Sequence, residues 1–135
     1  DLAGAEGIGY VRTPSSARLG PFGAAIRRLA RATAAEVASR GLATSDGFLG
    51  LDEAGRWDSA SLAAAIASSG SAVVELNAHP GPAFDPHRAR YAWQYHWGAE
   101  FDALTDPGTR GIIGRVGFRL VGPSQIEATV PAPAN

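Results

Sequence analysis

The sequence contains no cysteine and no lysine, and each absence excludes a class of chemistry. Without cysteine there is no disulfide bond, thiolate zinc site or cysteine nucleophile. All 12 basic residues are arginine, so no lysine amine is present to form a Schiff base. A formal net charge of -1 provides no basic field for nucleic acid.

Long apolar runs are also missing. No stretch approaches the roughly 20 apolar residues that a membrane-spanning helix requires, and no basic segment followed by an apolar one marks a secretory signal. We therefore expect no membrane span and a cytoplasmic location. Hydrophobic residues make up 45% of the 135 residues and charged residues 19%, which suits one globular domain.

Apolar residues alternate between strand-like and helix-like spacing, which indicates an α/β chain. Proline and glycine mark several of the boundaries. The predicted strands span 9–13, 44–49, 72–78 and 118–121. The predicted helices run from Pro21 to a stop at Gly41, from Asp58 or Ser59 to Gly70, from about 88 to 104, and from Asp106–Pro107 to about 116.

Strands joined by helical crossovers are parallel, so the pattern predicts about four parallel strands with crossover helices. Such a set forms either an open sheet or one side of a barrel. We expect one domain over residues 1–128 and a disordered tail over 129–135.

Polar residues alternate along the predicted strand at 72–78. Glu75, Asn77 and His79 share one face because successive side chains point to opposite sides. His79 falls at the carboxyl end, where parallel α/β folds place catalytic groups. The alternative is an exposed edge strand with a histidine in the following turn.

Two further strand-associated residues are candidates. Arg12 ends the first predicted strand on the same side as Tyr10, and its guanidinium is suited to a carboxylate or other anion. Asp46 stands at the second predicted strand. A surface arginine and a turn-forming aspartate are the plainer interpretations.

The remaining polar and aromatic residues give weaker signals. His79, His87 and His96 lack the spacing and carboxylate partners of a metal triad, so no metal site is expected from this chain alone. An aromatic cluster is predicted to wrap around its helix and pack on the sheet, with a sugar-stacking surface as the alternative; it comprises Tyr91, Trp93, Tyr95 and Trp97.

Five segments form a recognisable set of motifs. The most specific is Glu-Leu-Asn-Ala-His-Pro-Gly at 75–81. The others are Tyr-Val-Arg-Thr-Pro at 10–14, Ser-Asp-Gly-Phe-Leu-Gly at 45–50, Glu-Phe-Asp-Ala-Leu-Thr-Asp-Pro at 100–107 and Arg-Leu-Val at 119–121. In sequence and in their order along the chain, these segments resemble the YdjC-like (ChbG-type) carbohydrate deacetylases.

The resemblance implies a distorted (β/α) barrel of the polysaccharide-deacetylase type and hydrolysis of an N-acetyl group from an amino sugar. It implies that His79 assists the leaving amine and that Arg12 orients a carboxylate from outside this chain. Asp46, Glu75 and Asn77 would contact the substrate. A divalent metal, magnesium or zinc, would activate water, with aspartate and histidine ligands upstream of residue 1, so this chain alone is expected to be inactive.

Two other hypotheses remain open. In the first, the chain is a non-catalytic module that keeps a carbohydrate-binding face. In the second, it is an unrelated small α/β domain that binds a ligand at its strand ends. Part of a barrel also leaves unpaired strand edges, which predicts self-association.

Overall fold

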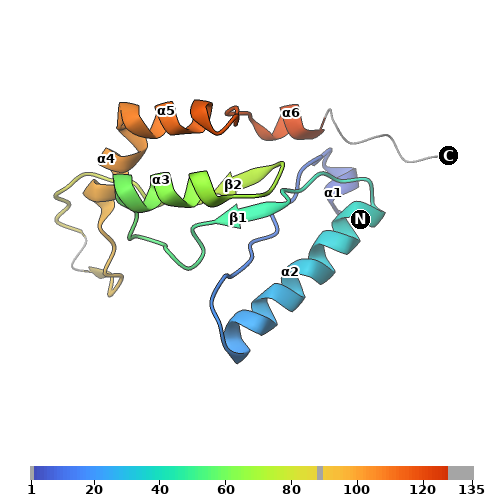
Figure 1. Ribbon diagram of the computed structural model, residues 1–135. Helices are drawn as coiled ribbons and strands as arrows, with labels where there is room; N and C mark the ends of the chain where they lie inside the picture. Colours follow the sequence, from blue (N-terminus) through green and yellow to red (C-terminus); the bar gives the residue numbers. More distant parts are fainter. Residues whose placement is uncertain (1, 88–89, 128–135) are drawn as a thin grey trace.

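The structure is a computed structural model that describes residues 2–87 and 90–127. Figure 1 shows a small parallel sheet with helices around it. In chain order the elements are α1 (Leu2–Ala5), α2 (Pro21–Ser39), β1 (Gly47–Leu49), α3 (Ser59–Ser68), β2 (Val74–Leu76), α4 (Trp97–Thr105), α5 (Pro107–Arg115) and α6 (Pro123–Glu127). This arrangement confirms the α/β class.

The sheet consists of β1 and β2, which run parallel and are joined by the crossover helix α3. Gly47 lies opposite Val74, and Leu49 lies opposite Leu76. One isolated parallel bridge, between Tyr10 and Ala43, adds a third segment beside the chain that leads into β1. The described residues therefore contain one complete parallel β-α-β unit, the repeating unit of a barrel, and the barrel itself stays a prediction.

The predicted strands are longer than the observed ones. The strand expected at 9–13 is reduced to the bridge at Tyr10, because Thr13 bonds through its side chain to Thr44 (2.8 Å) and Pro14 has no N–H to offer. The strand expected at 118–121 is wrong. Phe118 donates its N–H to Ile113 at the end of α5 (3.0 Å), and the residues after it pair with no strand in the described chain.

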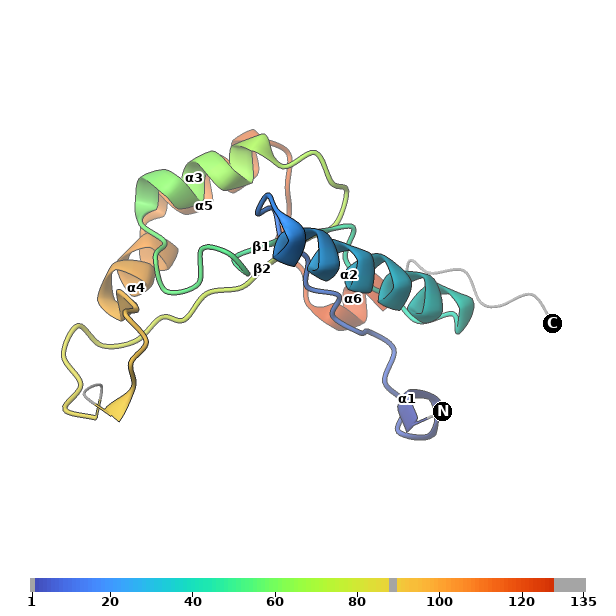
Figure 2. The ribbon, with the colours of Figure 1, turned by 90° about the horizontal axis from the view of Figure 1, so that it is seen from below.

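The core lies between α3, α4 and α5. Leu62, Ile66, Trp57 and Ala103 are buried there, and the apolar residues Leu49, Leu76, Ala78, Ile112, Ile113 and Phe118 pack around them. A capping box starts α3: the Asp58 carboxylate accepts from the Ser61 N–H (2.7 Å), and the Asp58 N–H donates to the Ser61 hydroxyl (3.1 Å). In Figures 1 and 2, α2 lies apart from α3 and α5.

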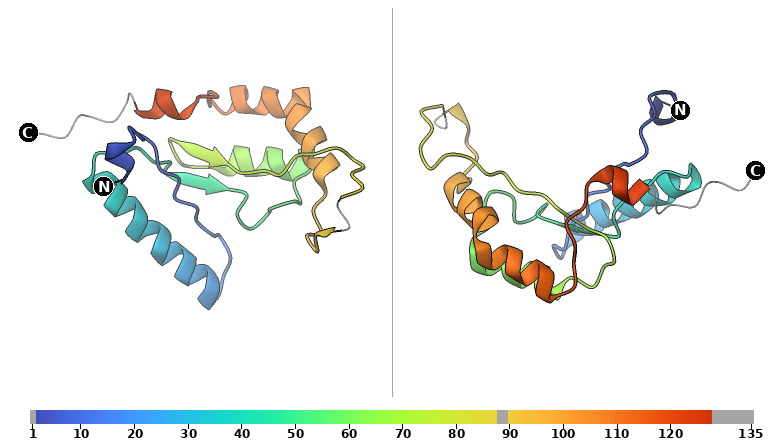
Figure 3. Two further views of the ribbon diagram at one scale, coloured as in Figure 1. Left: turned by 180° about the vertical axis from the view of Figure 1, so that it is seen from behind. Right: turned by 90° about the horizontal axis from the view of Figure 1, so that it is seen from above.

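The helix predicted over about 88–104 begins only at Trp97, and residues 91–96 are not helical. Residues 88 and 89 lie outside the described residues. The His96 N–H donates to the Gly55 carbonyl (2.6 Å), and the first helical bond runs from Glu100 to His96 (3.0 Å). Figures 2 and 3 show the segment before α4 projecting from the end of the molecule that bears α4, far from α1.

An open groove of about 900 Å³ lies along β2 and the segment that follows α5. Apolar residues line most of it, including Phe118 and Leu120, while Arg12, Glu75 and Arg119 supply charge. The free edge of β2 pairs with no strand in the described part of the chain. None of the described helices is long and apolar enough to cross a membrane.

Candidate active site

The chain leaves β2 at Leu76 and enters a turn that carries two of the predicted site residues, Asn77 and His79. The Asn77 N–H donates to the Leu49 carbonyl (2.8 Å), and its carbonyl accepts from the Trp57 indole N–H (3.1 Å). Both strands and the core therefore fix the backbone at the carboxyl end of the sheet. Within the described residues no hydrogen bond uses the Asn77 side-chain amide, which leaves it free to bind a ligand.

A buried carboxylate holds the next part of the turn. Glu100, in the first turn of α4, is completely buried. One carboxylate oxygen accepts the Trp57 N–H (3.2 Å) and the other accepts the His79 N–H. A helix N-terminus also favours negative charge. Because a buried carboxylate is costly unless its oxygens are bonded, these contacts fix Trp57, His79 and α4 relative to one another.

Sequence reasoning did not select Glu100 as a site residue. It appeared only within the 100–107 segment that resembles the deacetylase family. The available signal was a glutamate close to the start of an apolar helix. A carboxylate at such a position is either exposed to solvent or, when it is buried, bonded to backbone N–H groups.

The His79 imidazole lies against aromatic residues. Its Nδ1 atom is buried and has no hydrogen-bond partner in the described chain. The ring centroid lies 4.8 Å from that of Tyr95, at an interplanar angle of 48°. Since Nδ1 is enclosed, Nε2 is the ring nitrogen suited to exchange a proton with a ligand.

Three other residues form a polar cluster within the sheet. Arg12 forms an ion pair with Glu75, and the Tyr10 hydroxyl donates to the same carboxylate (2.8 Å). The Arg12 guanidinium also lies 6.0 Å from the centre of the Phe48 ring. Arg12 therefore has a carboxylate partner inside this chain, whereas the resemblance assigned it one from outside.

The surroundings of the Tyr10 hydroxyl in this cluster change its pKa. Burial raises the pKa of Tyr10, and the hydrogen bond and charge of Glu75 raise it further. The Ser45 hydroxyl and the Arg12 charge act in the opposite direction. Tyr10 is therefore protonated at neutral pH and acts as a hydrogen-bond donor to Glu75.

The predicted site residues lie at three positions along the strand direction of the sheet. His79 and Asn77 lie beyond its carboxyl end, while Arg12 and Glu75 meet at its middle. Asp46 lies at the amino end, where its carboxylate accepts the Val73 N–H (3.0 Å). Asp46 and His79 are therefore not brought together, and the role of Asp46 in substrate binding stays a prediction.

The donor set does not fit a metal ion. No group of three or more histidine, aspartate or glutamate side chains in the described ranges is arranged to hold one. Glu75 is paired with Arg12, and Glu100 is occupied by backbone N–H groups. What the arrangement offers instead is an imidazole with a fixed backbone at the carboxyl end of a parallel sheet, beside aromatic rings.

Parallel α/β folds bind ligands outside the carboxyl ends of their strands, and His79 lies at that end of β2. The family model of YdjC-like proteins matches residues 1–115, and the chain therefore belongs to the YdjC-like family. This family is associated with carbohydrate deacetylase-type chemistry. No curated protein and no solved structure gives a significant match.

Proposed function

We propose that this chain forms part of the active site of a carbohydrate N-deacetylase, which hydrolyses the N-acetyl group of an amino sugar or oligosaccharide. Membership of the YdjC-like family supports the class of substrate and of reaction. The observation that carries the proposal is the position of His79, directly beyond β2 and held through its backbone by the buried Glu100.

His79 is assigned the proton transfer to the leaving group. In the reaction, the oxygen of a water molecule bonds to the acetyl carbonyl carbon, and the bond between that carbon and the amide nitrogen breaks. The nitrogen must gain a proton as it leaves, because an amine anion is a poor leaving group. The protonated imidazole donates that proton from Nε2. The water loses two protons, of which one returns to the imidazole and the other passes to solvent, and the products are acetate and the free amine of the sugar.

The other residues are assigned to binding and support. The Asn77 amide, two residues before His79 in the chain, offers both a donor and an acceptor to sugar hydroxyl or acetamide groups. Arg12 and Glu75 hold each other and contribute a polar surface in the groove. A divalent metal, magnesium or zinc, remains an expectation from the resemblance, and its ligands would come from outside this chain.

The test is the substitution His79→Ala in the active protein. Turnover of an N-acetylated amino sugar, followed by acetate release, should fall about 10²–10⁴-fold, the range for losing a positioned acid. His87→Ala is the matched control, because His87 is exposed and should leave turnover unchanged.

A structural histidine would behave differently. Its removal would lower the melting temperature and leave turnover per folded molecule close to that of the wild type. That outcome would remove His79 from the mechanism. If the wild-type protein, with the metal ligands expected outside this chain, releases no acetate from any N-acetylated amino sugar, the deacetylase proposal as a whole is overturned.

A further inference from the structure

A row of four aromatic rings leads away from His79. Neighbouring rings contact one another along it: Tyr95 with Trp97 (5.7 Å), Trp93 with Tyr95 (5.8 Å) and Tyr91 with Trp93 (4.7 Å between centroids). The Tyr91 and Trp93 planes are inclined by only 19°. We call Tyr91, Trp93, Tyr95 and Trp97 the aromatic row, and it takes the place of the predicted helix over 91–96.

The two ends of the aromatic row differ in their surroundings. The Tyr95 ring lies directly on the backbone of Gly55, and the Trp97 ring lies on Gly81. By contrast, Tyr91 is 52% exposed and Trp93 is 55% exposed. The inner rings are therefore fixed by the fold, and they hold the outer rings in a set orientation towards solvent.

We infer that the outer rings, Tyr91 and Trp93, form a binding subsite for the pyranose rings of an oligosaccharide whose acetamide reaches His79. This inference rests on the proposed function and extends it. The subsite would bind sugar units next to the one that reacts, so the preferred substrate would have several sugar units.

The chemistry of the row suits a sugar. One face of a pyranose presents C–H groups, which are attracted to the negative face of an aromatic ring. Tyrosine and tryptophan also carry an O–H or N–H that can bond the hydroxyl groups at the edge of the sugar. Exposed leucine or phenylalanine side chains would offer only the apolar surface.

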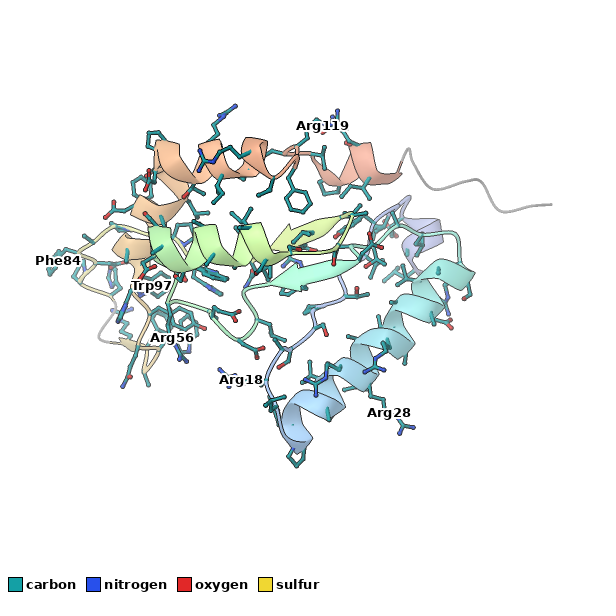
Figure 4. All side chains as sticks on the ribbon, viewed as in Figure 1. Arg18, Arg28, Arg56, Phe84, Trp97 and Arg119 are labelled. Carbon is teal, nitrogen blue, oxygen red and sulfur yellow. The ribbon has the colours of Figure 1, made fainter. Side chains whose placement is uncertain are left out.

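The position of the row suits the same ligand. The Tyr95 ring lies 4.8 Å from the imidazole of His79 and 5.8 Å from the Trp93 ring. The imidazole and Trp93 are thus separated by a single ring, a span that adjoining sugar units can cover. Figure 4 places Trp97 at the same end of the molecule as Arg56, an exposed arginine that offers a further hydrogen-bond donor there.

The inference can be tested by binding, without any turnover. The 135-residue chain is titrated with N-acetylglucosamine and with its β-1,4-linked dimer and trimer, and the tryptophan indole N–H signals are followed by NMR. The trimer should bind more tightly than the monomer and shift the Trp93 signal. Trp93→Ala should weaken trimer binding about tenfold, the order for losing one stacked ring.

Two control variants sharpen the result. Trp93→Phe keeps a ring and should retain most of the affinity, which separates stacking from a general loss of structure. Phe22→Ala removes an exposed ring from α2, 70% exposed and remote from the aromatic row, and should leave the affinity unchanged.

Three results would overturn the inference. The first is that the trimer does not bind, and the second is that it binds equally well to Trp93→Ala. The third is that the chain self-associates, that Trp93→Ala converts it to a monomer, and that the sugars have no effect. The last would show that the row is a contact between copies. Sugar binding through Trp93 in a protein that also carries the metal ligands expected outside this chain, without acetate release, would instead refute only the deacetylase proposal. Acetate release that is indifferent to Trp93 would refute only the subsite.

Discussion

Glu100 links two parts of the chain that the sequence does not show to be neighbours. It bonds the N–H of Trp57, just before α3, and the N–H of His79, just after β2. Each bond satisfies a backbone N–H close to the core. Neither of these two N–H groups has a second acceptor in the described contacts. Removing one carboxylate oxygen as an acceptor would leave one of these donors unsatisfied.

This leads to a prediction for Glu100→Gln. The amide keeps one acceptor oxygen and puts an NH₂ group against a backbone N–H, so we expect the free energy of unfolding to fall by about 2 kcal/mol, the order for a lost bond to a charged group. Urea denaturation measures the change. Asp102→Asn, an exposed position on the same helix, should stay within about 0.5 kcal/mol of wild type. Equal effects of the two variants would contradict the bridging role of Glu100.

At this scale the sequence predicted some placements and missed others. Alternation along a strand predicted that Glu75, Asn77 and His79 share one face. Of the three, only Glu75 lies within β2, so the shared face stays a prediction. The ion pair between Arg12 and Glu75 was missed, because it depends on how the 9–13 segment lies beside the sheet. Contacts between residues so far apart in the chain leave no local sequence signal.

At the scale of elements, the helices with strong boundary signals were predicted closely. The predicted start at Pro21 and the pair Asp106–Pro107 coincide with the starts of α2 and α5. The aromatic segment failed because its residues have no strong preference between helix and extended chain. There, ring contacts between every second residue and the hydrogen bond from His96 to Gly55 stabilise an extended segment in place of a helix.

The caps of α3 and α5 predict acid sensitivity. Backbone N–H donation from Ser61 lowers the pKa of Asp58 below its usual 3.8, and donation from Gly108 does the same for Asp106. Since both pKa values are lower in the folded chain, their stabilisation is present above pH 3.8 and is lost as the pH falls through the folded values. The melting temperature should therefore drop in acid, as circular dichroism would show.

The asparagine variants provide the control for this prediction. Asparagine also caps a helix but does not ionise in this range. The double variant of Asp58→Asn and Asp106→Asn should keep most of its stability at neutral pH and lose less of it in acid than the wild type does. An unchanged acid response in this variant would mean that other carboxylates control it.

At the scale of the whole molecule, much apolar surface is exposed. Along α2, Val37 is buried, while Phe22 is 70% and Leu29 is 64% exposed. The groove along β2 adds Leu120, which is 69% exposed. Strand edges and apolar patches of this kind favour contact with another chain. The strand predicted at 118–121 was wrong because local pattern does not show whether a segment has a neighbouring strand to pair with.

Self-association is therefore predicted to involve the groove. Light scattering should report dimers or larger species, and Leu120→Glu should shift them towards monomer, because a carboxylate within an apolar contact is costly. Leu19→Glu, on a residue that is 94% exposed and does not line the groove, should have no effect. A monomer at high concentration for the wild type would show that the groove and strand edge do not drive association.

The contact between Tyr95 and Gly55 restricts how this sequence can diverge. Gly55 has a φ of +75°, and an added Cβ would lie 2.1 Å from the Tyr95 ring, so both the backbone and the available space exclude a side chain. A larger residue at position 55 needs a smaller residue at position 95 to make space, and it still carries the backbone strain of the positive φ. The order of substitutions therefore matters: loss of the ring must come first, and with it goes the support of the aromatic row. Substitutions at positions 55 and 95, which are forty residues apart in the sequence, therefore depend on each other.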